Sequence, residues 1–217
     1  SFWRRNGDVS FAGKHYRLEL GKVLTPFVAP DRTSPEIYVS GHSERAENLA
    51  STQGTCWLRV IEEPETLRPV IERVRARGIR VCLRLGLICR PTHEEAVKAV
   101  EDLLPADKNE STTRLKDDSQ MYREGANLAS DKRWLSRSLW IGFVRNYGPV
   151  WTTLLGTPQE IADAFIEYKK IGVSEFIISG WPEVDELDIF GRDVLPLVRK
   201  AEQRLNSIGS DGSQGQV

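Results

Sequence analysis

The sequence lacks the features that mark several common classes of protein. Its 217 residues include three cysteines, three histidines and one methionine, and 30 basic side chains nearly balance 31 acidic ones. The resulting net charge of −1 gives no general attraction for nucleic acid or for an anionic membrane. No apolar run approaches the roughly 20 residues of a membrane-spanning helix, and no signal-peptide pattern is visible. We therefore expect neither a nucleic-acid partner nor a membrane partner.

The few cysteines also limit the chemistry. Cys56, Cys82 and Cys89 are odd in number and lie in strand-like apolar runs. Cys82 and Cys89 are seven positions apart on one predicted strand, so side-chain alternation puts them on opposite faces and disfavours a shared metal ion. Because disulfides persist mainly in oxidising compartments, we expect buried free thiols and a cytoplasmic location.

Motifs for several catalytic classes are missing. His15, His42 and His93 show no metal-ligand spacing, and the chain has no CxxC pair, no P-loop and no nucleophile elbow. No GxGxxG follows a predicted strand, which disfavours a Rossmann dinucleotide site. The chemistry must therefore come from less stereotyped groups of residues.

Apolar strand-like runs alternate with amphipathic helices. The predicted strands, each followed by a helical pattern, are 35–40, 55–60, 79–90 and 175–180. Capping boxes begin two helices, with Thr92 paired to Glu95 and Thr157 paired to Glu160. Strands that are apolar throughout are typical of a parallel sheet buried on both faces. The pattern predicts an α/β fold, either a small open sheet or half of a (β/α)8 barrel, because a full barrel needs about 250 residues.

Three segments break this rhythm. The sequence predicts a hairpin or excursion around Gly13, an insertion over about 105–156 and a disordered tail over 206–217. Long insertions after the carboxyl end of a strand are where α/β enzymes place lids. We therefore expect a single domain over 1–205 with a lid insertion.

The turn Ser40-Gly41-His42-Ser43 follows a predicted strand and precedes a helix. Backbone N–H groups and the helix dipole converge at such a point, and Gly41 allows close approach, so the turn could bind a phosphate. Serine is also a common N-cap, which makes an ordinary capped turn the alternative. Both interpretations stay open.

Arg84 lies within the apolar run "VCLRLGLIC". An arginine there is costly unless it has a partner or points into a solvated cavity. Alternation places Cys82, Arg84 and Gly86 on one face, and we expect Gly86 to leave space beside the guanidinium. The residue is either a ligand for an anion or half of a structural ion pair.

Two further candidates lie in loops. Arg145, in "GFVRNYGP", suits a lid that closes on an anion, although a solvated loop arginine is the alternative. Ser179, Gly180 and Trp181 end the last predicted strand. Trp181 could stack on a flat ligand or pack as a core aromatic under a loop.

Taken in order, these stretches resemble the flavin-dependent, bacterial luciferase-like monooxygenases, most closely the alkanesulfonate monooxygenase branch. The resemblance rests on "FAGKHYRLELGKVL", "PEIYVSGHSERAENLA", "CLRLGLICRPTHEEA", the segment from "SLWIGFVRNYGP" to "EFIISGWP", and "DIFGRDVLPLV". It covers nearly the whole chain apart from the tail. The order and spacing of the stretches carry it, since no single motif is decisive.

The resemblance implies the C-terminal portion of a (β/α)8 TIM-type barrel, with the N-terminal half absent. It implies reduced FMN supplied by a separate NAD(P)H-dependent flavin reductase, O2 as co-substrate, and a small anionic substrate such as a sulfonate. A homo-oligomer is also expected. By resemblance, Ser40–Ser43 bind the FMN phosphate, and Arg84 and the lid residue Arg145 hold negative charge in a closed site. Ser179, Gly180 and Trp181 would face the flavin.

Two positions depart from the family pattern. Gly86 stands where the family has His, and Trp181 stands where it has Tyr. Gly86 cannot transfer a proton, whereas Trp181 keeps a flat surface and one N–H donor. Two alternatives therefore stay open: a deazaflavin (F420)-dependent oxidoreductase that transfers hydride, and a catalytically inactive flavin-binding or assembly protein.

Overall fold

The computed structural model describes residues 8–22, 29–32, 34–104, 123, 127, 132–144, 151–180 and 183–211. The chain divides into two compact units, 1–37 and 38–217. Every predicted site residue that the structure describes belongs to the larger unit, which therefore carries the functional argument.

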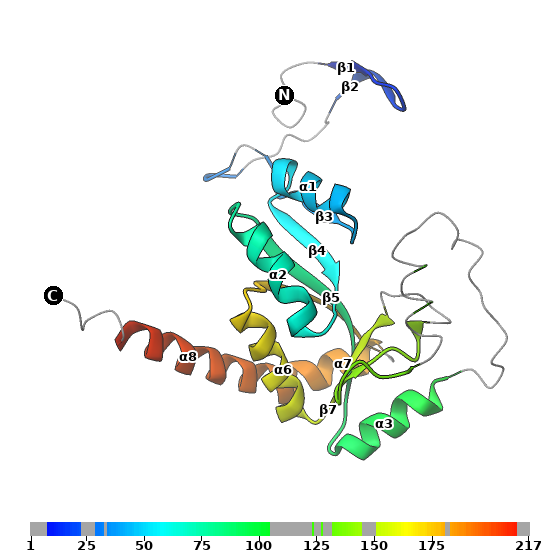
Figure 1. The fold of residues 1–217 in the computed structure, drawn as a ribbon, viewed down its shortest axis with the longest axis vertical. Helices are drawn as coiled ribbons and strands as arrows, with labels where there is room; N and C mark the ends of the chain where they lie inside the picture. Colours follow the sequence, from blue (N-terminus) through cyan, green and yellow to red (C-terminus); the bar gives the residue numbers. More distant parts are fainter. Residues whose placement is uncertain are drawn as a thin grey trace. The chain divides into compact units, whose positions relative to one another are not determined.

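The smaller unit contains an antiparallel hairpin (Figure 1), as the sequence predicted. Strand β1 (Val9–Ala12) pairs with β2 (Arg17–Gly21). The turn between them is closed by a hydrogen bond of 2.8 Å from the Gly13 N–H to the Tyr16 carbonyl. A two-stranded hairpin has little core of its own, which agrees with the exposure of its apolar side chains.

The larger unit is built on four parallel strands, also as predicted. They are β3 (Tyr38–Ser40), β4 (Cys56–Val60), β5 (Arg80–Cys89) and β8 (Glu175–Gly180). The order is β3-β4-β5, and β8 pairs with the other edge of β5. The predicted α/β fold with a parallel sheet is thus confirmed, and the described strands form an open sheet.

Two short strands extend this sheet beyond the predicted ones. Strand β7 (Thr153–Gly156) pairs in parallel with the carboxyl end of β5, and β6 (Leu139–Trp140) pairs antiparallel with β7. Both fall in the region 105–156, where the sequence predicted a lid insertion. The described end of that insertion belongs to the sheet, because β7 pairs with β5 and β6 pairs with β7.

Helices connect the strands, and the two helices that begin at capping boxes start where the sequence predicted. The helices are α1 (Glu44–Gln53), α2 (Pro64–Arg75), α3 (His93–Asp102), α6 (Pro158–Lys170), α7 (Glu183–Ile189), the π-helical η3 (Phe190–Val194) and α8 (Leu195–Asp211). The capping boxes at Thr92 and Thr157 are both formed. These caps fix the points at which two of the helices leave the sheet.

Most helices pack on one face of the sheet and form the main core. The strands contribute Val81, Leu83, Leu85 and Leu87 from β5 and Trp57 from β4, all of which are buried. Helices α2 and α6 lie beside these strands (Figure 1) and contribute Leu67, Ile71, Ile161 and Phe165. This core determines which side chains of each strand remain on the opposite face.

The C-terminal tail differs from the prediction over its first six residues. Helix α8 continues to Asp211, so 206–211 are helical rather than disordered. No proline interrupts this segment, and an established helix extends at low cost. Residues 212–217 lie outside the described residues.

Candidate functional site

Every second residue of the four parallel strands faces away from the helical core. The strand registers align these residues side by side on neighbouring strands. They are Tyr38, Ser40, Cys56, Leu58, Val60, Arg80, Cys82, Arg84, Gly86, Glu175, Ile177 and Ser179, and we call this surface the open face. Predicted site residues Ser40, Arg84 and Ser179 therefore share one face.

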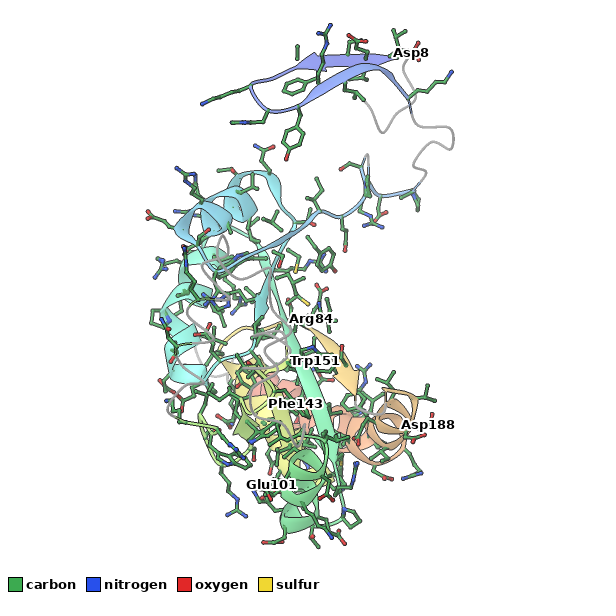
Figure 2. The ribbon with its side chains drawn as sticks, turned by 90° about the vertical axis from the view of Figure 1, so that its right-hand side faces the viewer. Asp8, Arg84, Glu101, Phe143, Trp151 and Asp188 are labelled. Atoms are coloured by element: carbon green, nitrogen blue, oxygen red, sulfur yellow. The ribbon has the colours of Figure 1, made fainter. Side chains whose placement is uncertain are left out.

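Arg84 lies partway along β5 within the open face (Figure 2). Its side chain is half-buried, and its Nε atom is buried with no hydrogen-bond partner among the described residues. No carboxylate in the described part of the chain forms an ion pair with it. A buried N–H without an acceptor is costly, and an anionic ligand at Arg84 would supply one.

The neighbours of Arg84 are apolar. Val60 and Ile177 flank it in register on β4 and β8. Toward the carboxyl end of β5, Ile88 is buried in a second apolar cluster with Trp140 and Phe143. In Figure 2, the labels of Trp151 and then Phe143 lie below that of Arg84. An anion bound at Arg84 would therefore lie next to the buried Val60 side chain and the exposed Ile177 side chain.

Gly86 does not leave the space that the sequence suggested. It lies between Thr153 of β7 and Ser179 of β8 in register. A Cβ added to Gly86 would lie 2.6 Å from the Thr153 Oγ1 atom, far closer than van der Waals contact. The expectation of free space at Gly86 was therefore wrong on the side of β7, because the strand register places the Thr153 side chain next to Gly86. Ser179 is half-buried on the other side.

The amino end of the open face carries a polar group of three residues. Tyr38 on β3 donates a hydrogen bond to Glu175 on β8, and Glu175 also accepts one from Arg80. The Arg80 guanidinium lies 5.9 Å from the centre of the Tyr38 ring. The hydrogen bond to Glu175 raises the pKa of Tyr38 to about 12. These contacts link the first and last of the parallel strands.

The three cysteines are free and buried, as predicted. Cys56 and Cys82 lie on the open face, whereas Cys89 belongs to the helical core. The hydrogen bond with Cys82, together with burial, raises the pKa of Cys56. Burial raises the pKa of Cys89 to about 11. The Cys56 and Cys89 thiols therefore stay protonated at neutral pH and are poor nucleophiles. The hydrogen bond with Cys56 instead lowers the pKa of Cys82.

The Ser40–Ser43 turn is a capped β–α turn. The Ser43 hydroxyl accepts a hydrogen bond of 3.2 Å from the Ala46 N–H and caps α1. The first turn of α1 also carries Glu44 and Glu47. Helix N-termini attract anions through N–H groups that have no intrahelical acceptor. The two carboxylates oppose that attraction, so any phosphate would have to approach from the turn side.

Gly41 uses its own backbone groups within the protein. Its carbonyl accepts a hydrogen bond of 3.1 Å from the Trp57 Nε1–H, and its N–H faces the Leu58 carbonyl at 3.3 Å. Its φ of 144° favours glycine, and an added Cβ would meet the Ala46 side chain. The glycine is therefore explained by chain geometry, and its backbone donates nothing to a ligand.

His42 points toward the helix side of the sheet. Its Nδ1 atom lies 3.1 Å from Arg59 Nη2, and its Nε2 atom lies 3.6 Å from the Glu62 carboxylate. His42 and Arg59 line a groove of about 620 Å³ between α1 and α2. Arg59 is a buried charge that the sequence analysis missed. Arg59 could have been found in the same way as Arg84, because each is a single arginine within an apolar strand.

A second missed residue is Glu186 on α7, which is fully buried. Its carboxylate accepts a hydrogen bond of 2.9 Å from the Cys89 N–H and another from the Arg90 side chain. It thereby ties α7 to the carboxyl end of β5. No local signal identifies it, because charged residues on an amphipathic helix are usually exposed.

Two predicted site residues, Arg145 and Trp181, lie outside the described residues. Ser179 and Gly180 form the last two positions of β8, and Gly180 pairs with Leu87. The structure therefore brings Arg84, Gly86 and Ser179 together, whereas Ser43 belongs to the start of α1.

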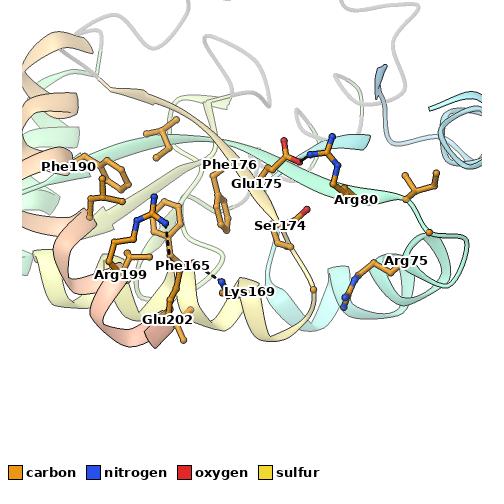
Figure 3. A pocket seen from close by; sticks show the side chains of 18 residues that line it. Arg75, Arg80, Phe165, Lys169, Ser174, Glu175, Phe176, Phe190, Arg199 and Glu202 are labelled. Atoms are coloured by element: carbon orange, nitrogen blue, oxygen red, sulfur yellow. Dashed lines mark hydrogen bonds and ion pairs between the residues drawn. The ribbon is translucent and has the colours of Figure 1, made fainter. Parts of the chain in front are cut away.

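A well-defined cavity among the described residues lies elsewhere. It measures about 750 Å³ and opens beside the amino ends of β5 and β8, next to α6 and α8 (Figure 3). Lys169 and Arg199 in its wall both pair with Glu202. None of the predicted site residues lines it, so it does not support the predicted site.

No set of three or more His, Cys, Asp or Glu side chains in the described ranges is arranged to hold a metal ion. Likewise, none of the helices that the structure describes combines the length and the apolar character needed to cross a membrane.

Comparison with known proteins bears on both the fold and the family. Residues 1–175 match the sequence profile of the luciferase-like monooxygenase family. Among solved structures, EDTA monooxygenase from Chelativorans sp. BNC1 superposes with a TM-score of 0.62 at 19% identity, over 90% of this chain and 51% of that one. A riboflavin lyase bound to modified FMN and riboflavin gives a TM-score of 0.61 at 21% identity, over 90% of this chain and 49% of that one.

Two further solved structures share this fold. DmoA from Hyphomicrobium sulfonivorans gives a TM-score of 0.60 at 19% identity, over 88% of this chain and 46% of that one. An F420-dependent secondary alcohol dehydrogenase gives 0.56 at 18% identity, over 91% of this chain and 58% of that one. The chain thus spans about half the length of the structures that it matches, and at these identities the likeness shows the fold alone.

Proposed function

Because the chain belongs to the luciferase-like monooxygenase family, we propose that it forms part of an FMNH2-dependent monooxygenase that uses O2 on a small anionic substrate, such as a sulfonate. The observation that supports this proposal most directly is Arg84. Its buried Nε has no acceptor among the described residues, on the face that the helices leave uncovered. A sulfonate oxygen would supply that acceptor.

Arg84 would bind and orient the anion. Its half-buried guanidinium, flanked by Val60 and Ile177, would hold a charged head group while the substituent contacts apolar side chains. Fixed donors in a site that excludes water stabilise negative charge without reorganisation. In the proposed enzyme Arg145 would hold further negative charge, and Trp181 would contact the flavin.

The FMN would be held at the carboxyl ends of the strands. The N–H groups at the start of α1, behind the Ser40–Ser43 turn, would bind its phosphate, and Ser179 and Gly180 would lie near its ring. When bound, reduced FMN would supply the electrons that reduce O2. We further propose that a separate NAD(P)H-dependent flavin reductase supplies the reduced FMN and that the enzyme is a cytoplasmic homo-oligomer.

A deazaflavin-dependent oxidoreductase is the second candidate. It is favoured by the fold shared with the F420-dependent secondary alcohol dehydrogenase. A catalytically inactive flavin-binding or assembly protein is the third, since neither Gly86 nor the Thr153 beside it offers a titratable group. The three candidates differ in cofactor and in turnover, and one set of measurements separates them.

The test combines cofactor binding with oxygen uptake. The protein would be titrated anaerobically with reduced FMN and with reduced F420, and oxygen consumption would then be measured with and without methanesulfonate. We expect binding of reduced FMN and substrate-dependent oxygen uptake. Arg84→Gln should lower that uptake by roughly 100-fold or more, as loss of a charge-stabilising donor does. Arg77→Gln, at an exposed arginine just beyond α2, is the matched control.

Three results would count against the proposal. Preference for reduced F420 would support the second candidate, and FMN binding without turnover would support the third. Equal oxygen uptake by Arg84→Gln and Arg77→Gln would show that the Arg84 side chain does not bind the substrate.

A further inference from the structure

A buried arginine lines the groove between α1 and α2. Arg59 is 8% exposed, and it alternates along β4 toward the helices, as the core residue Trp57 does. The groove measures about 620 Å³, a volume typical of small-molecule sites. It lies on the helix side of the sheet, whereas Arg84 belongs to the open face. The proposed monooxygenase site therefore does not use this groove.

The Arg59 guanidinium is held in place by three neighbouring side chains. Its Nη2 atom lies 3.1 Å from His42 Nδ1 and donates to the Glu62 carboxylate, and its Cζ atom lies 5.0 Å from the centre of the Trp57 ring. Because the donor is already fixed, a ligand that binds to it costs little side-chain entropy.

Part of the Arg59 guanidinium remains unused. Its Nε atom is buried without an acceptor, and its Nη1 atom has no hydrogen-bond partner in the described part of the chain either. Unlike Nε, the Nη1 atom is not buried. Its two N–H donors are therefore available to a ligand that enters the groove.

The charges around the groove leave an excess of positive charge. Four arginines and two glutamates line it, and Glu62, which pairs with Arg59, raises the negative charges to three. Glu47 is neutralised by Arg73, whose guanidinium donates hydrogen bonds of 3.1 and 3.0 Å to it. Arg45 of α1 forms no ion pair within the described ranges. It is therefore a second cation that an anionic ligand could neutralise.

The available donors come from different elements. Arg59 belongs to β4, whereas Arg45 and Asn48 are exposed residues of α1 that line the same groove. A tetrahedral phosphate group has acceptor oxygens in several directions, so it can accept from donors on separate elements. Arginine side chains also match the spacing of phosphate oxygens. A groove of this size leaves room for an organic group attached to the phosphate.

We propose that the groove between α1 and α2 binds the phosphate group of a small phosphorylated molecule. Arg59 is the buried donor, and Arg45 and Asn48 are the exposed donors. This site is separate from the open face, so it does not depend on the proposed monooxygenase function.

Calorimetric titration with ribose 5-phosphate tests the proposal, with ribose as the uncharged control and inorganic phosphate as a second probe. We expect one molecule of ribose 5-phosphate per chain and no binding of ribose. Arg45→Gln should weaken the binding by about tenfold or more, the effect of losing a charged hydrogen-bond donor. Arg68→Gln, at an arginine of α2 that pairs with Glu65 outside the groove, is the matched control and should bind as wild-type protein does.

Arg59→Gln should abolish the binding, with circular dichroism as the check that this variant folds. The exposed Arg45→Gln keeps the proposal testable if it does not. Equal affinity of wild-type protein, Arg45→Gln and Arg68→Gln would overturn the proposal, and so would a failure of both phosphate probes to bind at millimolar concentrations. Binding of inorganic phosphate alone would reject a phosphorylated molecule as the ligand. Competition between FMN and ribose 5-phosphate would overturn the separate location of the site.

Discussion

Single buried polar groups hold this protein together at points where apolar packing cannot act. Glu186 is the clearest case, because its carboxylate is fully buried and accepts hydrogen bonds from the Cys89 backbone and the Arg90 side chain. Removing one partner of a buried pair leaves the other charge uncompensated. The Glu186 carboxylate therefore helps to hold helix α7 at the end of β5, together with the packing of Ile189 on the core.

We predict that Glu186→Gln lowers the free energy of unfolding by about 3 kcal/mol, the loss typical of breaking a buried ion pair. Urea denaturation would measure it. Glu65→Gln, which breaks the exposed pair with Arg68, is the control and should leave the stability nearly unchanged. Equal effects of the two substitutions would contradict the structural role assigned to Glu186.

At the scale of elements, the starts of α3 and α6 are joined by one carboxylate. Glu160 accepts a hydrogen bond of 2.9 Å from the Thr157 N–H, and it lies 3.0 Å from His93 Nδ1 and 3.1 Å from Arg137 Nη2. Burial acts to raise the pKa of Glu160, but the hydrogen bonds from Thr157 and His93 outweigh it and lower the pKa. The ionised form is therefore the one that joins the helices.

This arrangement predicts a pH dependence. A group whose pKa is lowered by folding stabilises the protein above its ordinary pKa and loses that effect as the pH falls. Wild-type protein should therefore be more stable than Glu160→Gln at pH 7, and the difference should shrink as the pH falls below about 4.5, the ordinary value for Glu. Glu94→Gln, exposed in the first turn of α3, is the control. A difference that is independent of pH would contradict this interpretation.

At the scale of the whole larger unit, the first and last parallel strands meet on the open face. Tyr38 of β3 and Glu175 of β8 are hydrogen-bonded although β4 and β5 lie between their strands. Neighbouring strands in a flat sheet are about 4.8 Å apart, so side chains on two strands that are separated by two others would rarely meet. The contact requires the open face to be concave.

The same contact predicts an alkaline effect. The pKa of Tyr38 is raised to about 12, so its protonated form stabilises the fold fully below pH 10, the ordinary value, and this contribution is lost as the pH rises toward 12. Tyr38→Phe should therefore lose less stability than wild-type protein between pH 10 and pH 11.5, as measured by urea denaturation. Tyr16→Phe, on the hairpin, is the control. Parallel loss in all three proteins would count against the Tyr38–Glu175 bond.

The sequence predicted those strands and helix starts that depend on local residue patterns. The apolar runs at 55–60 and 79–90 became β4 and β5, and the capping boxes at Thr92 and Thr157 formed. Arg84 could be identified because a charge in an apolar run is conspicuous. The close approach of Thr153 to Gly86 could not be identified from the sequence, because it results from the register of two strands that are far apart in the sequence. Such pairings are set by tertiary packing.

The position of β5 has a consequence for how the molecule folds. Strand β5 pairs with β4, which is nearby in the sequence, but its pairing with β8 joins residues such as Cys82 and Glu175, which are 93 positions apart. Closing so long a loop is slow, and it follows the local pairings. During synthesis, β5 must wait with one edge unsatisfied until β8 emerges from the ribosome, so this interval is the one in which the nascent chain is most exposed to aggregation.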